Sequence, residues 1–486
     1  MLSAESPLIL SPKTGVQALN EIDGAIGSMS NVGRWACTAT EWLNEWDLDL
    51  PGMRAICRGV DFYRGLEEAL CCKFRRWTLD FSDPAVMHAA LGYLWEMDFI
   101  ITWIDRLKQI AMETGVPILI FTSVTHSGNR FAARAYLNAV SERGDVTLVA
   151  SCDAYESYYN NYGSEYSTAI ALRSMTKYKT LAHACNAPVE EFEKWFKSAW
   201  KPGGGDSAWA DQILRSDRVK KPRTEAAIHM RDRLLAARLS GKSIVCLFGK
   251  ILFDQTVPVR GGPAHTGMDD WVKHSLEVVA GRDDVLLLIK PHPHELRDDI
   301  ATYPSEMLAD WLPSDPPDHV IVLPHHMFNL YEVVEFIDLA VMWNGSSSIE
   351  LGILGVPCVV CGLYGEIDYP VGHIVPRDRD HYGWLLTHAK KVEPPAGVAD
   401  RSRALLEYRA SVDVATPYRY TRRGNTNKKL SCYEWFRDDL ERYHADGDPF
   451  VTFMVNRIHG DLMELRNKKQ EEAEATPKVS LVAGEA

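Results

Sequence analysis

Several features that define common classes of protein are missing from this sequence of 486 residues. No apolar run is long enough to span a bilayer, and residues 1–15 lack the basic segment and apolar core of a secretory signal. Lys and Arg number 53 against 66 Asp and Glu, and a formal net charge of −13 argues against a general nucleic-acid binder. We therefore expect a cytoplasmic protein with no transmembrane segment and no nucleic-acid partner, and peripheral association with the inner face of the cytoplasmic membrane stays open.

A disulfide framework is also missing, because the ten cysteines follow no regular spacing. Cys358 and Cys361 form a C-x-x-C, but Val359 and Val360 between them indicate a β-strand, whereas a redox pair needs a helix start. Positions i and i+3 of a strand face opposite sides of a sheet. The sequence therefore predicts neither a redox nor a metal role for this pair, and no metal or cofactor for the chain.

Apolar runs that alternate with helix-compatible stretches predict an α/β protein with two doubly wound regions. In the first region, strands predicted at 117–121 and 146–149 flank a helix-compatible stretch at 131–140, which is the βαβ order of a parallel sheet. The second region supplies five predicted strands, at 243–248, 285–289, 320–323, 339–343 and 357–361. Such sheets bind ligands at the carboxyl ends of their strands.

The segment 201–205, Lys-Pro-Gly-Gly-Gly, marks the clearest break in the chain. We expect residues 1–215 to form an N-terminal α/β domain with a helical N-terminal extension. Residues 216–400 are expected to form a Rossmann-type domain, and 401–465 to add helices that pack back on the body. The charged segment 466–486 is expected to be a disordered tail.

The motif Lys290-Pro291-His292-Pro293-His294 directly follows a predicted strand. Its two prolines fix the local backbone, so Lys290 and His292 could bind a phosphate at little ordering cost. A protonated histidine could also assist the departure of a phosphate leaving group. A rigid polar turn with solvated histidines is the alternative. A metal pair of His292 and His294 is not favoured, because no Cys, Asp or Glu cluster lies close in sequence.

A second motif, between the strand predicted at 339–343 and a helix, reads Asn344-Gly345-Ser346-Ser347-Ser348. Free N–H groups at a helix start accept phosphates, Gly345 permits a tight turn, and the serine hydroxyls add donors. Ser347 and Glu350 also have the spacing of a capping box, with Ser347 at the N-cap. Glu350 therefore either caps the helix or reaches a ligand hydroxyl.

A third polar loop follows the strand predicted at 243–248 and continues to Gly262. Asp254 in this loop is a candidate base or nucleophile toward a sugar carbon. Arg260 is a candidate bidentate partner for a phosphate or a carboxylate. Because the three polar loops follow strands of one predicted sheet, we expect them to converge on one ligand site.

In the N-terminal half, the loop 125–130 follows one predicted strand and contains His126, a candidate base on the acceptor side. Asp153 and Glu156, after the strand predicted at 146–149, are similar candidates. Each of these residues is also an ordinary loop residue in the simplest interpretation.

The ordered set F-G-x(4)-D, K-P-H-P and S-S-x-E-x-G-x-x-G-x-P, between about residues 243 and 372, resembles the capsule polysaccharide biosynthesis family. That family includes bacterial transferases of the sugar acid Kdo, and bacterial sialyltransferases share a similar His-Pro and paired-serine pattern. The resemblance implies a GT-B fold, in which two Rossmann-type domains face a cleft, and a CMP-linked sugar donor. It implies that His292 and 346–348 lie near the donor phosphate, and Asp254 or Glu350 near the chemistry.

The sequence therefore predicts a glycosyltransferase that moves a sugar from a nucleotide-activated donor, with a CMP-linked sugar acid favoured. The acceptor would be a glycan, glycolipid or glycoprotein in bacterial surface polysaccharide synthesis. No metal is needed in this scheme, because a helix dipole and cationic side chains offset the leaving-group charge. The alternatives are a polyol-phosphate transferase of the teichoic-acid type and a non-catalytic scaffold that binds a nucleotide sugar.

Overall fold

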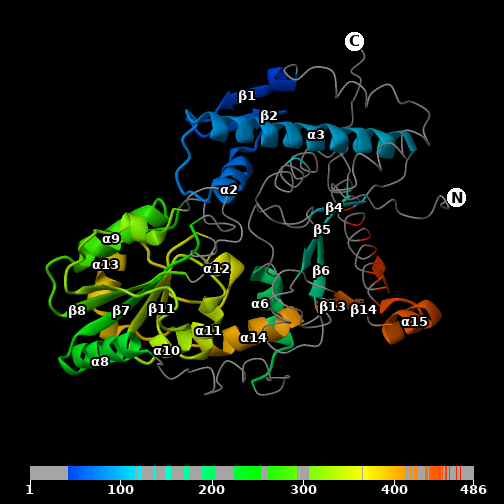
Figure 1. Cartoon of the computed structure of the whole chain (residues 1–486). Helices are drawn as coiled ribbons and strands as arrows, with labels where there is room; N and C mark the ends of the chain where they lie inside the picture. The colour runs from blue at the N-terminus through cyan, green and yellow to red at the C-terminus, as the bar shows by residue number, and fades with distance from the viewer. Residues whose placement is uncertain are drawn as a thin grey trace, which may run out of the picture.

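The fold is taken from a computed structural model, shown in Figure 1. The residues that it describes are 42–114, 119–122, 136, 148–154, 168–174, 189–202, 224–252, 261–292, 295, 306–363, 365–410, 416–418, 421–423, 433–435, 437–449, 451, 452, 455, 456, 459, 463, 467 and 471. None of the helices in this part of the chain combines the length and the apolar character that crossing a membrane requires.

A five-stranded sheet, parallel throughout, organises the C-terminal half. Its strands are β7 (Ser243–Phe248), β8 (Val285–Lys290), β9 (Val320–Val322), β10 (Leu339–Met342) and β11 (Cys358–Val360). Their order is β11-β10-β7-β8-β9. Strand β7 therefore lies at the centre of the sheet. Strands β8 and β9 follow on one side of it, and β10 and β11 on the other. The predicted strands match the observed ones to within one or two residues.

Helices cover both faces of this sheet, which is why its strands are continuous apolar runs. All six residues of β8 are buried. Val285, Leu287 and Ile289 contribute to one core, and Leu286 and Leu288 to the other. The surrounding helices are α8 (Glu225–Leu239), α9 (Met268–Val279), η7 (Leu308–Trp311), α10 (Leu330–Val333), α11 (Ser347–Ile353), α12 (Gly365–Asp368), α13 (Arg379–Thr387) and η8 (Ala389–Lys391). Figure 1 shows α9 and α13 together on one side and α8 on the other.

The cysteine pair behaves as its strand position predicts. Cys358 and Cys361 are fully buried and belong to the two different cores, one on each face of the sheet. Burial raises the pKa of both thiols well above the usual range. Neither sulfur is therefore a ready nucleophile.

A second sheet of four strands lies apart from the first. Its strands are β4 (Leu119–Thr122), β5 (Leu148–Ala154), β6 (Thr168–Ser174) and β12 (Thr416–Tyr418). Strands β4 and β5 are parallel, as the βαβ pattern predicts, whereas β6 and β12 join antiparallel. The α/β fold class is thus confirmed, with a mixed sheet in place of a fully parallel one here. The segment after 410 returns to this sheet through β12.

The described part of the C-terminal segment contains strands as well as helices. It contains α14 (Val398–Ala410), the antiparallel pair β13 (Thr421–Arg423) and β14 (Tyr433–Trp435), and α15 (Arg437–Asp446). Helix α14 packs on α11 and on α6 (Val189–Ser198) through an apolar cluster that includes Phe192 and Tyr408. Arg401 of α14 pairs with Glu193 of α6 and fixes this contact.

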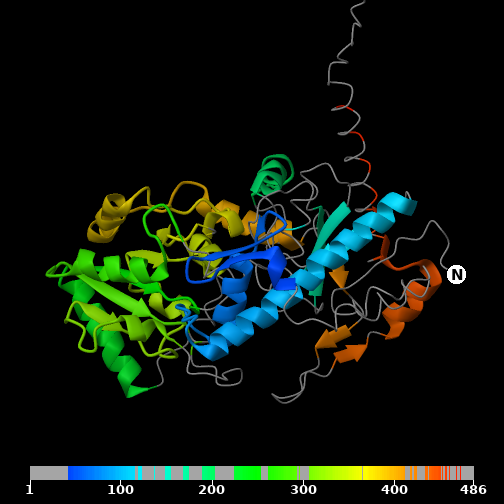
Figure 2. The same cartoon turned by 90° about the horizontal axis from the view of Figure 1, so that it is seen from above.

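A third unit precedes both sheets. It comprises η3 (Trp42–Glu45), β1 (Trp46–Asp49), β2 (Arg54–Cys57), β3 (Val60–Asp61), α2 (Tyr63–Phe74) and α3 (Pro84–Thr114). The three strands form an antiparallel meander, which the helical pattern of this region did not predict. In the two views, the 31-residue helix α3 runs from this unit toward the second sheet (Figures 1 and 2).

Trp77, Trp311 and Glu306 join the N-terminal unit to the parallel sheet. The Trp77 N–H donates to Glu306 Oε2 at 2.7 Å, and the Trp311 indole donates to Oε1 at 2.7 Å. The two indoles meet edge to face at 5.8 Å. One carboxylate therefore fixes both tryptophans at the junction.

Candidate functional site

The point where the parallel sheet changes direction of winding lies between β7 and β10, and β8 is the other neighbour of β7. Met342, Phe248 and Lys290 stand opposite one another in the strand register. The loops that follow these three strands therefore start side by side at the carboxyl edge. This is the place where doubly wound sheets bind ligands.

The loop after β8 lies tightly against the loop after β7. The Gly249 N–H donates to Lys290 O at 2.9 Å. A Cβ at Gly249 would lie 3.2 Å from both Lys290 O and Pro291 Cα, so a larger residue there would push the two loops apart. Gly249 thus sets the spacing between β7 and the Lys-Pro-His-Pro segment.

Lys290 and His292 are both described and lie at this edge. Lys290 is only 6% exposed, and burial lowers the pKa of its ammonium group. His292 is half-buried, and its carbonyl accepts the Glu295 N–H at 3.0 Å. His294 lies outside the described residues. A buried lysine beside a half-buried histidine is an arrangement suited to an anionic ligand.

The serine motif begins where β10 ends. Asn344 is 5% exposed, and Gly345 has φ +144°, a conformation that favours glycine. The N–H groups of Ser348 and Ile349 are used by the carbonyls of Gly345 and Ser346. The buried hydroxyl of Ser348 has no hydrogen-bond partner among the described residues. The turn therefore holds a buried hydroxyl close to the strand ends.

The predicted capping box is not formed, and that prediction was wrong. Helix α11 starts at Ser347, so Ser346 is the N-cap, and its side chain makes no capping hydrogen bond. The Glu350 carboxylate instead accepts a short hydrogen bond from the Tyr331 hydroxyl of α10. Ser346 has helical dihedrals, φ −62° and ψ −22°, which do not suit side-chain capping. Glu350 is thus tied to α10.

The loop after β7 returns at the end of β11. The Leu363 N–H donates to Gly261 O at 3.0 Å, and a Cβ at Gly262 would lie 1.9 Å from Cys361 O. Asp254 and Arg260, which the sequence places in this loop, lie outside the described residues. Their predicted roles stay predictions.

Two further titratable residues, Glu366 and His373, support the serine turn. The Glu366 carboxylate accepts the N–H groups of Gly372 at 2.8 Å and His373 at 3.0 Å. Burial nevertheless raises the pKa of Glu366 to about 7. His373 Nε2 donates to Ser348 O at 2.7 Å, and burial lowers the pKa of this imidazole. No spacing in the sequence marks this pair, because the contact depends on how 365–373 folds beside β11.

A second pair stands behind the Lys-Pro-His-Pro segment. Glu295 Oε2 and His325 Nε2 are 2.9 Å apart, and Glu295 is 3% exposed. Burial raises the pKa of Glu295 to about 8 and lowers that of His325. Both shifts favour a neutral pair, in which the carboxyl donates to the imidazole. No pattern in the sequence indicates this pair, since its members are thirty positions apart.

The acceptor-side candidates are less defined. His126 and Glu156 lie outside the described residues. Asp153 was expected in a loop after a strand, but it lies within β5, opposite Ala171 of β6. The strand extends further than predicted because 150–154 continue the antiparallel pairing with β6.

Comparisons with known proteins give distant structural similarity only. No family model matches the chain, and no curated protein matches it. A UDP-GlcNAc 2-epimerase from Neisseria meningitidis bound to UDP-GlcNAc is 13% identical, with a TM-score of 0.27, over 66% of this chain and 88% of that one. A UDP-GlcNAc 2-epimerase from Methanocaldococcus jannaschii is 12% identical, with a TM-score of 0.27, over 71% and 96%. A glycotransferase of kitacinnamycin is 16% identical, with a TM-score of 0.23, over 68% and 80%.

Proposed function

We propose that the carboxyl edge of the parallel sheet binds a nucleotide-activated sugar and that the chain is a glycosyltransferase. The observation that supports this most directly is the register of Met342, Phe248 and Lys290, which starts three polar loops side by side. The ordered motifs in these loops resemble those of the capsule polysaccharide biosynthesis family. That resemblance favours a CMP-linked sugar acid as the donor and a bacterial surface glycan or glycoconjugate as the acceptor.

In this proposal Lys290 and the turn 344–348 hold the donor phosphate. A desolvated ammonium group gains most from an anion, because burial has removed the competing water. The hydroxyl of Ser348, which lacks a partner among described residues, is a further donor. Protonated His292 would assist departure of the nucleotide. Asp254 or Glu350 would stabilise positive charge at the sugar carbon or attack it, and Arg260 and His294 would add contacts to the donor.

A thermal-shift screen of CMP, UDP and GDP tests the binding step. A nucleotide at about 100 times its Kd should add about 2.7 kcal/mol to the free energy of unfolding. We expect CMP to stabilise the chain most. Equal stabilisation by all three nucleotides, or by none, contradicts the proposed donor class.

Replacement of His292 by Ala tests the catalytic step. Loss of a general acid lowers turnover by about 100-fold or more, while nucleotide binding should change much less. His326→Ala is the matched control, since His326 is an exposed histidine after the neighbouring strand β9. Transfer that is unaffected by His292→Ala would contradict the assigned role. Phosphate found on the product would instead identify a polyol-phosphate transferase.

A further inference from the structure

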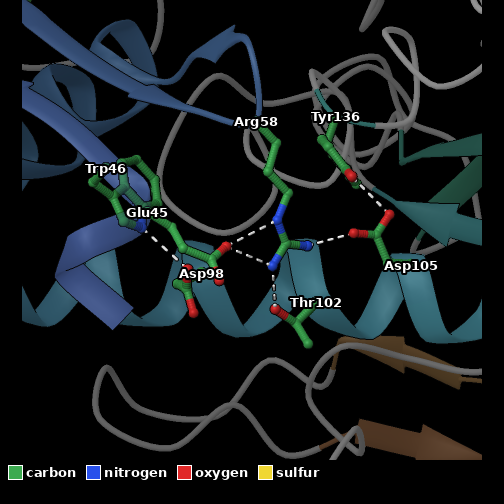
Figure 3. Close-up of polar contacts among 7 residues, drawn as sticks. All are labelled: Glu45, Trp46, Arg58, Asp98, Thr102, Asp105 and Tyr136. Carbon is green, nitrogen blue, oxygen red and sulfur yellow. Dashed lines mark hydrogen bonds and ion pairs between the residues drawn. The ribbon is translucent and has the colours of Figure 1, made fainter. Parts of the chain in front are cut away.

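A group of potential metal ligands lies in the N-terminal unit, away from the sheet edge. One ligand atom from each of Glu45, Cys57 and Asp98 lies within 4.8 Å of the other two. In the part of the chain that the structure describes, this is the one group of three or more such residues. Glu45 ends η3, Cys57 ends β2, and Asp98 stands on α3. Figure 3 shows the carboxyl groups of Glu45 and Asp98 close together, with the Trp46 indole on one side of them and the Arg58 guanidinium on the other.

The thiol and one carboxylate of this group are deeply buried. Cys57 is 0% exposed, and its thiol is free of any disulfide. Asp98 is 4% exposed and accepts a hydrogen bond from the Trp46 indole at 3.1 Å, on Oδ1. A carboxylate and a thiolate buried together are costly unless protons or a cation neutralise them.

Within the part of the chain that the structure describes, one oxygen of each carboxylate accepts no hydrogen bond. Arg58 places both of its hydrogen bonds to Glu45 on Oε2, at 3.2 and 3.0 Å. Glu45 Oε1 and Asp98 Oδ2 are therefore the oxygens that can turn to a cation. The guanidinium and the indole would then orient the ligating carboxylates from outside, as second partners of metal ligands commonly do.

The wider network favours added positive charge. Asp98, Thr102 and Asp105 stand at intervals of four and three on one face of α3 (Figure 3). Arg58 also contacts Thr102 and Asp105, and Tyr136 donates to Asp105 at 2.6 Å. Among the described residues, one guanidinium thus lies near three carboxylates, those of Glu45, Asp98 and Asp105. A divalent cation between Glu45 and Asp98 would offset the excess.

We propose that Glu45, Cys57 and Asp98 form a structural binding site for Zn²⁺ or a similar borderline-soft divalent cation. A thiolate with two carboxylates disfavours Mg²⁺ and Ca²⁺, which prefer oxygen ligands alone, and suits Zn²⁺. The three ligand atoms lie within 4.8 Å of one another, and tetrahedral ligation would bring them to about 3.5 Å. The Cys57 proton leaves to solvent when the sulfur binds. Glu45 is exposed, so a cation can reach the site from solvent along this side chain.

Co²⁺ serves as the spectroscopic probe, added at one equivalent to the metal-free full-length chain. We expect the thiolate-to-cobalt charge-transfer absorption to appear in the wild type, to disappear in Cys57→Ser, and to be displaced by Zn²⁺. Cys72→Ser is the matched control, because Cys72 is a half-buried thiol of α2 outside the group. No absorption in the wild type, or absorption that persists in Cys57→Ser, overturns the proposal.

Glu45→Gln keeps the experiment decisive if Cys57→Ser does not fold, because Glu45 lies at the surface. Its Zn²⁺ affinity, measured by competition with a chelator, should fall about 10-fold or more. Asp47→Gln is the control, since Asp47 is an exposed carboxylate of β1 that pairs with Arg54 outside the group. Wild-type affinity in Glu45→Gln overturns the proposal.

Discussion

The N-terminal unit and the carboxyl edge of the parallel sheet both hold polar groups close to a core, but they do so by different means. In the N-terminal unit, Arg58 lies among the carboxylates of Glu45 and Asp105, and charge pairing orders the side chains. At the sheet edge, burial favours the neutral forms of Glu295 and His325, and close backbone packing fixes the loops. The sheet edge therefore depends more on the volume of its closely packed residues, and the N-terminal unit depends more on the charge of its side chains.

The largest difference is expected between glycines of the two regions. Gly262→Ala should lower the free energy of unfolding by about 3 kcal/mol, because its Cβ would lie 1.9 Å from Cys361 O and backbone cannot easily move away. Gly92 lies in an exposed part of α3, and a Cβ added there would have no atom within 4 Å. Gly92→Ala should therefore raise the free energy of unfolding by about 0.5–1 kcal/mol. Chemical denaturation measures both. If the two substitutions change the free energy of unfolding equally, the two regions do not differ in how tightly they are packed.

A smaller effect should appear in the pH dependence of Glu295. A carboxyl whose pKa is raised to about 8 in the folded state holds a proton that the unfolded chain has lost, so stability falls as pH rises from about 4.5 to about 8. The pKa of His325 is lowered, so this residue makes stability rise with pH, but only below about pH 6.5. The slope due to Glu295 is therefore clearest between pH 6.5 and 8.

Glu295→Gln should remove that slope, so that relative to wild type it gains about 2 kcal/mol between pH 6.5 and 8. Glu335→Gln, at an exposed position of the same sheet region, is the control. Unfolding free energies measured at the two pH values give the comparison. If the free energy of unfolding depends on pH in the same way in wild type and in Glu295→Gln, burial does not raise the pKa of the Glu295 carboxyl.

The two regions also differ in how far the sequence predicts them. Strands such as 243–248 and 285–290 are found because burial on both faces requires continuous apolar runs, and Lys290 is then placed at a strand end. The meander at 46–61 is missed because its strands have two to four residues and carry polar side chains. Short strands have too few residues to show a period.

The sequence does not predict the residue pairs that support the site, and the reason is different. His373, with Glu366 behind it, meets the serine turn only because the segment around Ile374 lies along β11. Glu295 and His325 come from the ends of neighbouring strands, and neither has a local pattern. Sequence motifs therefore indicate the residues at the strand ends, while the residues behind them depend on tertiary contacts.

A small change is also expected at Arg58, whose φ of 49° belongs to the two-residue turn between β2 and β3. Arg58→Asn keeps a residue that tolerates this conformation and removes the contacts to Glu45, Thr102 and Asp105. Because the guanidinium is about a quarter exposed, we expect a loss of only about 1 kcal/mol, and less in high salt. Arg54→Asn, at a more exposed pair of the same hairpin, should cost less still. If Arg58→Asn is as damaging as Gly262→Ala, charge pairing stabilises the N-terminal unit as strongly as volume does the sheet edge, and the contrast between the two regions fails.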